Sequence, residues 1–508
     1  MTLVCLFLFL AFSSLGLSML FFSQIYLRSS AYKKNSTLLS YSSENGIKTG
    51  FSQLLSLLFK TSLPSYLSPQ ETLELRENTR NKGSALLEKL LGSKPPLRTS
   101  QNWENMAWES IIDFDLEELL ETEDYFHATY RIAIRSKGKI KNFNKIHESS
   151  FDASLGIFAG NIPLAFIPLL IDMELDPDQK QNLMEKSRIT FLPLEKNLAP
   201  LEACFSEEGL IPDEANDQLK KALKIRFFHP QNLSNSLLRV ILGLEKTNEP
   251  VPDGVYLIKD STGLGGIFVQ GDLEEMVMAI DGSYQVVSFL TEKGRWTLSF
   301  SPSLAKTIFS TPDEIFTYNL IPLGIIIVNG EIISLGGGVK EASGNFTLSQ
   351  EEIPSILNGT KLAIVSSDKI KISSHLIQQG VRWMEGIPYV KGSNSGLVIF
   401  AAGKDFIDGS KREGGIIVDR NSPEEIKIQA FLTASDKGFS IEGKQKTVYI
   451  LGSLQATNLS SNENSLKIKF DERLLEKLED NILELSLPQT TKPVVFLSFL
   501  KAFEWKEF

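Results

Sequence analysis

MTLVCLFLFLAFSSLGLSMLFFSQIY, residues Met1–Tyr26, is the stretch from which the predicted fold follows. It contains no charged side chain, and the first charge after it is Arg28. About 20 apolar residues in a helix cross a hydrocarbon core of roughly 30 Å. The backbone groups of such a helix are satisfied internally, as lipid requires. The stretch therefore predicts a membrane-spanning helix that tethers a soluble body.

A cleaved signal peptide is the other interpretation of this stretch. It requires a basic residue before the apolar run and a small-x-small cleavage site after it, and the sequence has neither. An uncleaved span is therefore favoured. Its orientation is left open, because Arg28, Lys33 and Lys34 follow the span and the positive-inside rule would place that side in the cytoplasm.

Length and composition bound the rest of the chain. The 508 residues are enough for the span and two or three domains. The net charge of −10 argues against nucleic acid as a partner. Only two cysteines are present, Cys5 within the span and Cys204 in the body, so no intrachain disulfide is expected and Cys204 is interpreted as a small buried hydrophobe.

The N-terminal helix is predicted to continue beyond the span. From Leu27 to Lys60, apolar residues recur at spacings of three and four, which is typical of a helix with one buried stripe. The first domain is therefore residues 1–60. Residues 61–102 mix Pro, Ser, Gly and charge and are predicted to be a stalk or linker, with a short helix at Ser84–Leu91.

Residues 103–250 are predicted to form a mixed α/β region. Asp115–Glu123 is acidic and is assigned to a helix, whereas Tyr130–Arg135 alternates as a half-buried strand does. Phe158–Ile171 is apolar but too short to span a bilayer, and prolines interrupt it, so it is assigned to buried core or a docking edge. Two further helices are predicted at Pro177–Lys186 and Pro212–Ile225.

From Asp253 onward the sequence consists of short runs rich in β-branched residues, separated by short polar segments that we call corners. Corners such as Gln270-Gly271-Asp272 and Asn329-Gly330-Glu331 contain residues that tolerate a positive φ. Two architectures produce this pattern: antiparallel hairpins in a sandwich, or a β-solenoid whose corners turn the chain onto the next wall. The solenoid is favoured because the runs are short, similar to one another and apolar enough to be buried. We assign it residues 251–475, and residues 476–508 to a C-terminal tail packing on it.

No residue pattern indicates catalysis. The four histidines are scattered, and the glycine clusters at 263–266 and 336–338 lack the phosphate-binding spacing. Glu274-Glu275, Glu351-Glu352 and Glu424-Glu425 are adjacent carboxylates, which a strand would point to opposite faces. The sequence therefore predicts no catalytic, cofactor-binding or metal-binding residue, and a protein that is not an enzyme. The histidines are His127, His147, His229 and His375.

The first stretch resembles the N-terminal helix of type IV pilin-like proteins of the minor-pilin kind. In that family a basic leader is removed before a residue such as Phe or Met, and Met1-Thr2-Leu3-Val4 stands where the mature start would stand. Ser43-Glu44-Asn45-Gly46-Ile47 occupies the place of an Ala-Glu-Ala-Gly-Leu stretch. Cys5 stands where a glutamate is common. The resemblance implies that the helix packs with other pilin-like subunits.

A second resemblance covers residues 250–508. The order of its short runs is similar to that of a right-handed β-helical domain of unknown function, found in bacterial envelope proteins behind pilin-like N-termini. The runs are IFVQGDL (267–273), IIIVNGEI (325–332), LAIVSSDKIKIS (362–373), LVIFAAG (397–403), IQAFLTA (428–434), GFSIEG (438–443), VYILGSL (448–454) and FDERLL (470–475).

Together these observations predict an α+β protein with a long N-terminal membrane-spanning helix, a mixed α/β middle and a C-terminal right-handed β-solenoid-like domain. The predicted function is that of a non-enzymatic, membrane-anchored pilin-like envelope protein, a minor component of a type IV pilus or a related secretion or adhesion assembly. The predicted location is the bacterial inner membrane, with the body on the periplasmic or extracellular side. Its expected partners are other pilin-like subunits, the lipid bilayer and an extracellular polysaccharide or surface. The alternative is a membrane-anchored carbohydrate-binding or carbohydrate-active protein on a solenoid scaffold.

Overall fold

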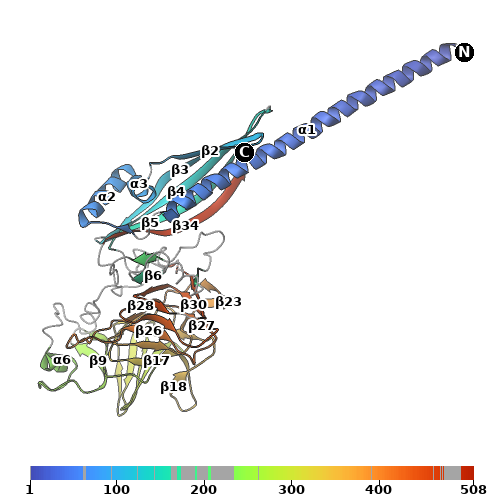
Figure 1. Cartoon of the computed structure of the whole chain (residues 1–508). Coiled ribbons are helices and arrows are strands. Elements are labelled where there is room, and N and C mark those ends of the chain that lie inside the picture. The colour runs from blue at the N-terminus through green and yellow to red at the C-terminus, as the bar shows by residue number, and fades with distance from the viewer. Residues whose placement is uncertain are drawn as a thin grey trace.

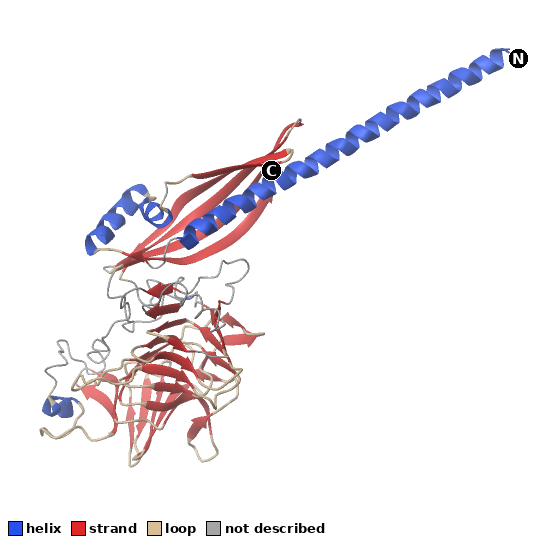
Figure 2. Ribbon diagram, in the orientation of Figure 1, coloured by secondary structure: helices blue, strands red, loops and turns tan. Residues whose placement is uncertain are grey.

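The computed structural model of the chain is rich in strand and contains few helices (Figures 1 and 2). This agrees with the predicted α+β class at its coarsest level, with strands outnumbering helices. Within α1, the side chains described are those of residues 23–54 and 57. The predicted helices at Pro177–Lys186 and Pro212–Ile225 lie outside the described residues. The structure describes residues 2–60, 65–92, 94–122, 124–141, 143–161, 169–172, 189–191, 204–206, 234–260, 263–390, 392–460, 463–469, 471, 473 and 493–507.

The first body, here called the head, is an antiparallel sheet with helices on one face. The sheet order is β1-β34-β5-β4-β3-β2, and the second half of α1 (Thr2–Lys60) lies along it (Figure 1). Helices α2 and α3 lie beside α1 over the same sheet. The other elements are α2 (Pro69–Lys82), α3 (Ala85–Leu91), β1 (Ser65–Tyr66), β2 (Leu97–Trp103), β3 (Met106–Glu121), β4 (Tyr125–Ile140), β5 (Phe143–Gly160) and β34 (Val494–Glu507).

The helix docks because its stripe repeats at the period of an α-helix. Leu39, Ile47 and Leu54 are buried, and they are seven or eight residues apart, which places them on one face. Beneath them the buried residues of β4 alternate with exposed ones, as in a sheet with one covered face. Each fully buried Leu or Ile side chain contributes about 1.5–3 kcal/mol to this contact.

Residues 61–102 are not a stalk. The predicted short helix is confirmed as α3, but its Leu86 and Leu87 are buried in the same core as Leu54 of α1. Helix α2 begins at a capping box, in which the Ser68 side chain accepts from the backbone of Glu71 and the Glu71 carboxylate accepts from the backbone of Ser68. These helices therefore complete the head.

The acidic stretch assigned to a helix is a strand. Asp115–Glu121 lies within β3, and β3 pairs with β4 along its whole length. The acidic residues occupy exposed positions between partly buried apolar ones, so the strand period of two fits them better than a helix does. The predicted strand at Tyr130–Arg135 is confirmed as part of β4.

The C-terminal strand returns to the head. Strand β34 pairs antiparallel with β5, from Val494 opposite Gly160 to Glu507 opposite Ser149. The predicted packing of a 476–508 tail on the solenoid is therefore wrong for its described part. Because Gly160 and Val494 are direct partners, everything between them is an insertion between two adjacent strands. No local pattern predicts this pairing, since its partners are more than 300 residues apart in the sequence.

The second body, here called the stack, contains rows of parallel strands. Its main sheets have the orders β8-β6-β31-β28-β25-β20-β16-β10-β9, β15-β14-β13-β12-β11-β17-β21-β26-β29-β32 and β27-β30-β33-β7. The chain passes from a strand in the first sheet to one in the second and then one in the third, as in β25 (Gly396–Ala401), β26 (Gly415–Val418) and β27 (Glu425–Ile428).

That passage repeats, and each repeat lies on the one before it. The next two repeats use β28 (Phe431–Ala434), β29 (Gly438–Ile441) and β30 (Thr447–Leu451), then β31 (Ser453–Ala456), β32 (Leu459–Ser460) and β33 (Ser465–Lys469). Register places apolar residues directly over one another, and one ladder is Ile267, Ile326, Ile364, Ile399, Leu432 and Leu454. All six are buried in one core cluster.

Two of the earlier repeats also have a third strand, since β19 (Pro354–Ile356) and β22 (Ile377–Gln378) pair with each other in parallel. The hairpin alternative is wrong for the corners of these repeats. Strand β16 pairs in parallel with β10 and β20, not with β17, which follows it after Asn329-Gly330-Glu331. Hairpins occur instead in the meander from β11 to β15. These strands are β9 (Gly254–Asp260), β10 (Gly263–Gln270), β11 (Glu275–Asp281), β12 (Tyr284–Thr291), β13 (Gly294–Ser301), β14 (Lys306–Ser310), β15 (Ile315–Tyr318), β16 (Ile325–Asn329), β17 (Ile332–Lys340), β20 (Lys361–Ser366) and β21 (Ile370–Ile372).

The stack was predicted to begin at residue 251, but three strands that precede this residue in the sequence also belong to its sheets. Strands β6 and β8 continue the first sheet beyond β31, and β7 continues the third beyond β33. The bounds of these three strands are β6 (Leu169–Asp172), β7 (Ile189–Phe191) and β8 (Cys204–Ser206). The remaining elements are α6 (Asn235–Ile241), β18 (Phe346–Leu348), β19 (Pro354–Ile356), β22 (Ile377–Gln378), β23 (Val381–Met384) and β24 (Ile387–Val390).

The prediction of a membrane-spanning helix has to be corrected. Across the part of the chain that the structure describes, no helix combines the length and the apolar character needed to traverse a bilayer. This finding contradicts the span predicted at Met1–Tyr26, and with it the predicted inner-membrane location.

Candidate functional site

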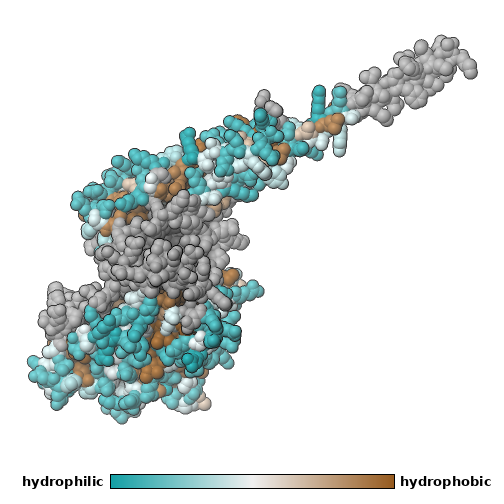
Figure 3. Space-filling view, in the orientation of Figure 1, coloured by the Kyte–Doolittle hydropathy of each residue, from teal (hydrophilic) through white to brown (hydrophobic). Residues whose placement is uncertain are grey.

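The most exposed element is the first part of α1, which extends away from the head (Figure 1). We call its residues 23–38 the projecting segment. Large apolar side chains on it face solvent: Tyr26 is 75 % exposed and Leu27 is 63 % exposed, and Ile25 and Tyr32 are about half exposed. Figure 3 shows brown side chains among teal ones on this segment. Apolar side chains of this size on one protruding helix are typical of a surface that another molecule covers.

The head holds α1 through an unusually close contact at the next turns. The Ser42 hydroxyl donates to the backbone oxygen of Ala107 at 2.8 Å, and the hydroxyls of Ser43 and Ser149 lie 2.7 Å apart. Gly138 of β4 faces this part of the helix, and a Cβ atom on it would lie 2.6 Å from the backbone nitrogen of Ser43. The close packing of Ser42 and Ser43 of α1 against Gly138 and Ser149 of the sheet therefore holds the helix where the projecting segment leaves the head.

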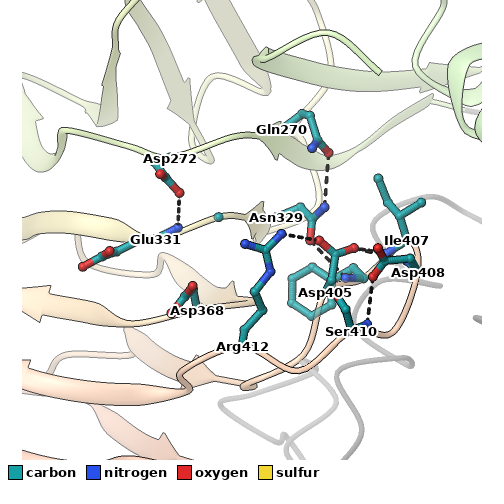
Figure 4. Close-up of polar contacts among 12 residues, drawn as sticks. Gln270, Asp272, Asn329, Glu331, Asp368, Asp405, Ile407, Asp408, Ser410 and Arg412 are labelled. Atoms are coloured by element: carbon teal, nitrogen blue, oxygen red, sulfur yellow. Dashed lines mark hydrogen bonds and ion pairs between the residues drawn. The ribbon is translucent and has the colours of Figure 1, made fainter. Parts of the chain in front are cut away.

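A second polar group lies at the corner between the first and second sheets of the stack (Figure 4). Gln270 and Asn329 are partners in register, and the Asn329 amide donates to the Gln270 side chain at 3.3 Å. The Asp272 carboxylate accepts from the backbone nitrogen of Glu331 at 2.7 Å. A Cβ atom at Gly330 would lie 2.3 Å from the backbone oxygen of Gly271, so glycine is required for the corners to stack.

A loop from Gly403 to Gly414 folds back over this corner. The Asp405 carboxylate accepts from the backbone nitrogen of Ile407 at 2.8 Å and from the Arg412 guanidinium at 2.8 Å. The backbone nitrogen of Phe406 donates to the Asn329 side chain at 3.0 Å, and the Phe406 ring is buried. The loop is therefore anchored by the buried Phe406 ring, by the ion pair of Asp405 with Arg412, and by the hydrogen bond to Asn329.

The charges at this corner are largely compensated within the protein. Hydrogen bonding to Asp405 raises the pKa of Arg412, and hydrogen bonds from Ser410 lower the pKa of Asp408. Burial raises the pKa of Glu331, opposed by Lys369, whose amine lies 3.9 Å from the carboxylate. Among the described residues, no set of three or more His, Cys, Asp and Glu side chains is arranged to hold a metal ion.

The adjacent carboxylates, from which the sequence predicts no site, have basic partners or lie in separate sheets. Glu275 contacts Arg295 at 3.2 Å, and Glu352 forms an ion pair with Lys427. Glu425 begins β27 in another sheet. The described partners of these carboxylates are basic groups rather than a second carboxylate, so the arrangement does not resemble that of a glycosidase.

The histidines are also separated. His127 and His147 belong to the head, and His375 to the stack, while His229 lies outside the described residues. Burial lowers the pKa of His127 to about 4, and burial also lowers the pKa of His375. The His375 ring accepts from the backbone nitrogen of Lys427 at 3.1 Å, which is a structural contact.

Sequence reasoning missed the loop over the corner. Asp405, Asp408, Gly409 and Ser410 form a run of turn-forming residues, and that run was the available signal. The interpretation of the glycine cluster at 263–266 as a turn before a strand is wrong, because residues 263–266 lie within β10 (Gly263–Gln270). Comparison with protein-family models, curated proteins and solved structures found no match to this chain.

Proposed function

We propose that this chain is a non-enzymatic structural subunit of a fibre-like assembly, similar in plan to a pilin-like protein. The carrying observation is the projecting segment of α1, whose apolar side chains face solvent although the rest of the helix is docked on its own sheet. The resemblance of Met1-Thr2-Leu3-Val4 and Ser43–Ile47 to minor pilins supports the same proposal.

In this proposal α1 has two roles divided near Leu39. Before Leu39 its side chains contact neighbouring subunits, and from Leu39 onward they bury their stripe in the head. An isolated exposed helix of this length is marginally stable in water, and packing against other helices would stabilise it. The partners are copies of this chain or related pilin-like subunits.

We further propose that the stack is a β-solenoid, the extended module that the assembly displays. Support comes from the repeated passage through three sheets and from the parallel register that places Ile399 over Ile364 and Leu432 over Ile399. Stacked repeats make long, stiff surfaces, which suits bracing or adhesion. Its insertion between Gly160 and Val494 would leave the head sheet complete while the module is displayed.

The alternative of a carbohydrate-active protein stays a prediction. The described carboxylate pairs contact basic groups, and no observation on the stack favours that function over display.

Sedimentation velocity of the full chain tests the proposed function. We expect concentration-dependent large species for the parent chain, and their loss in a variant with Ile25→Asp and Leu27→Asp. The control is Leu73→Asp, which changes an apolar side chain of α2 that is also exposed, at 61 %. The proposal fails if the parent is monomeric at every concentration, or if the helix variant assembles as the parent does.

A further inference from the structure

The head carries opposite charge at its two ends. Residues 137–145, around the end of β4 and the start of β5, contain four lysines and no carboxylate. One of them, Lys137, is compensated by Glu148, with which it forms an ion pair at 2.8 Å, whereas Lys139, Lys141 and Lys145 add to the positive charge. Residues 113–121, in the second half of β3, contain five carboxylates and no basic residue. Strand register separates the two groups, because Lys139 lies opposite Ala107, whereas Glu118 lies opposite Thr129. At roughly 3.3 Å per residue, the eleven positions from Ala107 to Glu118 correspond to about 35 Å.

The basic group joins the projecting segment of α1. The Lys145 amine lies 4.8 Å from the centre of the Tyr32 ring. Gly138 faces the helix near Leu39, so Lys137 and Lys139, its neighbours on β4, point to the opposite, exposed face of the sheet at the same end of the head. Three more basic side chains on the segment are exposed, and α1 has no carboxylate before Glu44. We call this group the basic collar: Arg28, Lys33, Lys34, Lys137, Lys139, Lys141 and Lys145, all exposed.

The acidic group forms a matching surface at the other end of the head. Four of its carboxylates are on exposed residues, and Asp113 is half-buried. Glu121 forms an ion pair with Arg80 of α2, and Arg131 of β4 contacts Asp152 on the neighbouring strand. We call this group the acidic end: Asp113, Asp115, Glu117, Glu118 and Glu121.

We propose that the basic collar of one copy binds the acidic end of a second copy, so that heads associate head to tail. This inference rests on the proposed function and names the partner surface for the projecting segment. The complementary surfaces lie at opposite ends of one head, so the contact is heterologous, and repeating it adds further copies instead of stopping at a dimer. Charge complementarity of this kind fixes orientation and rejects like-charged pairing.

The partner is a second copy because the chain supplies both signs. Residues 44–508 carry all 62 carboxylates and 49 of the 52 basic side chains, since three of the latter lie in the collar before residue 44. Residues 44–508 therefore have a formal net charge of −13 (49 basic minus 62 acidic residues), and they attract the positively charged projecting segment of another copy.

A charge-swap experiment on the full chain tests the proposal. One variant carries Lys139→Glu and Lys141→Glu, the other Glu117→Lys and Glu118→Lys. Each alone is expected to raise the dissociation constant of self-association about 10- to 100-fold, from lost attraction and like-charge repulsion. Mixed in equal amounts, they are expected to co-assemble more tightly than either does alone, because reversed collars meet reversed acidic ends. That recovery also shows that both variants are folded.

The control is a charge reversal on the stack, Lys246→Glu with Arg420→Glu, which should leave the dissociation constant unchanged. The proposal is overturned if both head variants assemble as this control does, or if the mixture shows no recovery. It is also overturned if the collar variant loses binding to phosphatidylserine vesicles while its self-association is unchanged. If Ile25→Asp with Leu27→Asp still abolishes assembly in such cases, the proposed function stands without this contact.

Discussion

Substituting Gly138 with alanine tests how α1 is held on the head. A Cβ atom there would lie 2.6 Å from the backbone nitrogen of Ser43 and 2.8 Å from the backbone oxygen of Leu39. Non-bonded heavy atoms prefer roughly 3.5–4.0 Å, so helix and strand must separate by about 1 Å. The neighbouring atoms are helix backbone, which no side-chain rotation can move aside.

The expected destabilisation has two parts. Overpacking of this kind costs about 1–3 kcal/mol. Separation also lengthens the hydrogen bond from Ser42 to Ala107 and the contact between Ser43 and Ser149, at a cost of about 0.5 kcal/mol each. The sum is about 2–4 kcal/mol, a large fraction of the ~5–15 kcal/mol that stabilises a typical domain. Intrinsic preference acts in the opposite direction, since alanine in a strand is favoured over glycine by about 0.5–1 kcal/mol.

Amide hydrogen exchange of α1 residues 39–60 measures this effect in the full chain. After the opposing 0.5–1 kcal/mol is subtracted, about 1–3.5 kcal/mol remains, and at about 1.4 kcal/mol per factor of ten exchange should accelerate roughly 5- to 300-fold. The control is Lys139→Ala, an exposed neighbour on the same strand, which should change stability by less than about 0.5 kcal/mol. Exchange in Gly138→Ala that is unchanged or slower would refute the close-packing argument.

Three further predictions follow from burial and hydrogen bonding. In the folded head the pKa of His127 is lowered to about 4, so between pH 6.5 and pH 4 the unfolded chain binds a proton at this residue and the folded chain does not. The free energy of unfolding of the head should therefore fall by about 3 kcal/mol as the pH falls through this range. Thermal melts of His127→Leu should lose this part of the pH dependence. Asn329→Ala removes the acceptor that holds Phe406, so limited proteolysis should cleave the loop from Gly403 to Gly414 faster while the thermal midpoint of the stack changes little. Leu432→Ala should destabilise the stack by about 2–5 kcal/mol in urea melts, and an effect below about 1 kcal/mol would contradict its place in the central ladder.

The parts of the fold that sequence could predict are those governed by local periodicity. The stripe through Leu39, Ile47 and Leu54 follows helix spacing, and the corners at Gln270-Gly271-Asp272 and Asn329-Gly330-Glu331 follow the tolerance of these residues for tight turns. Both the helical stripe and the corners depend only on neighbouring residues, so they can be predicted without knowing the rest of the fold.

The parts that sequence could not predict depend on distant partners. The acidic run in β3 resembles a helix by composition, and only its pairing with β4 makes it a strand. The return of β34 to β5 requires two segments more than 300 residues apart in the sequence to meet. The ion pair of Glu352 with Lys427 likewise depends on how the repeats stack, so the adjacent carboxylates could not be distinguished from a site beforehand.

The most direct test of the central claim is a cryo-electron microscopy map of the assembled full chain. We expect a fibre in which residues 23–38 of α1 contact neighbouring subunits on all copies, while residues 39–60 keep their contact with their own head. A chain that yields only single particles, or an assembly in which residues 23–38 remain in solvent, would contradict the claim.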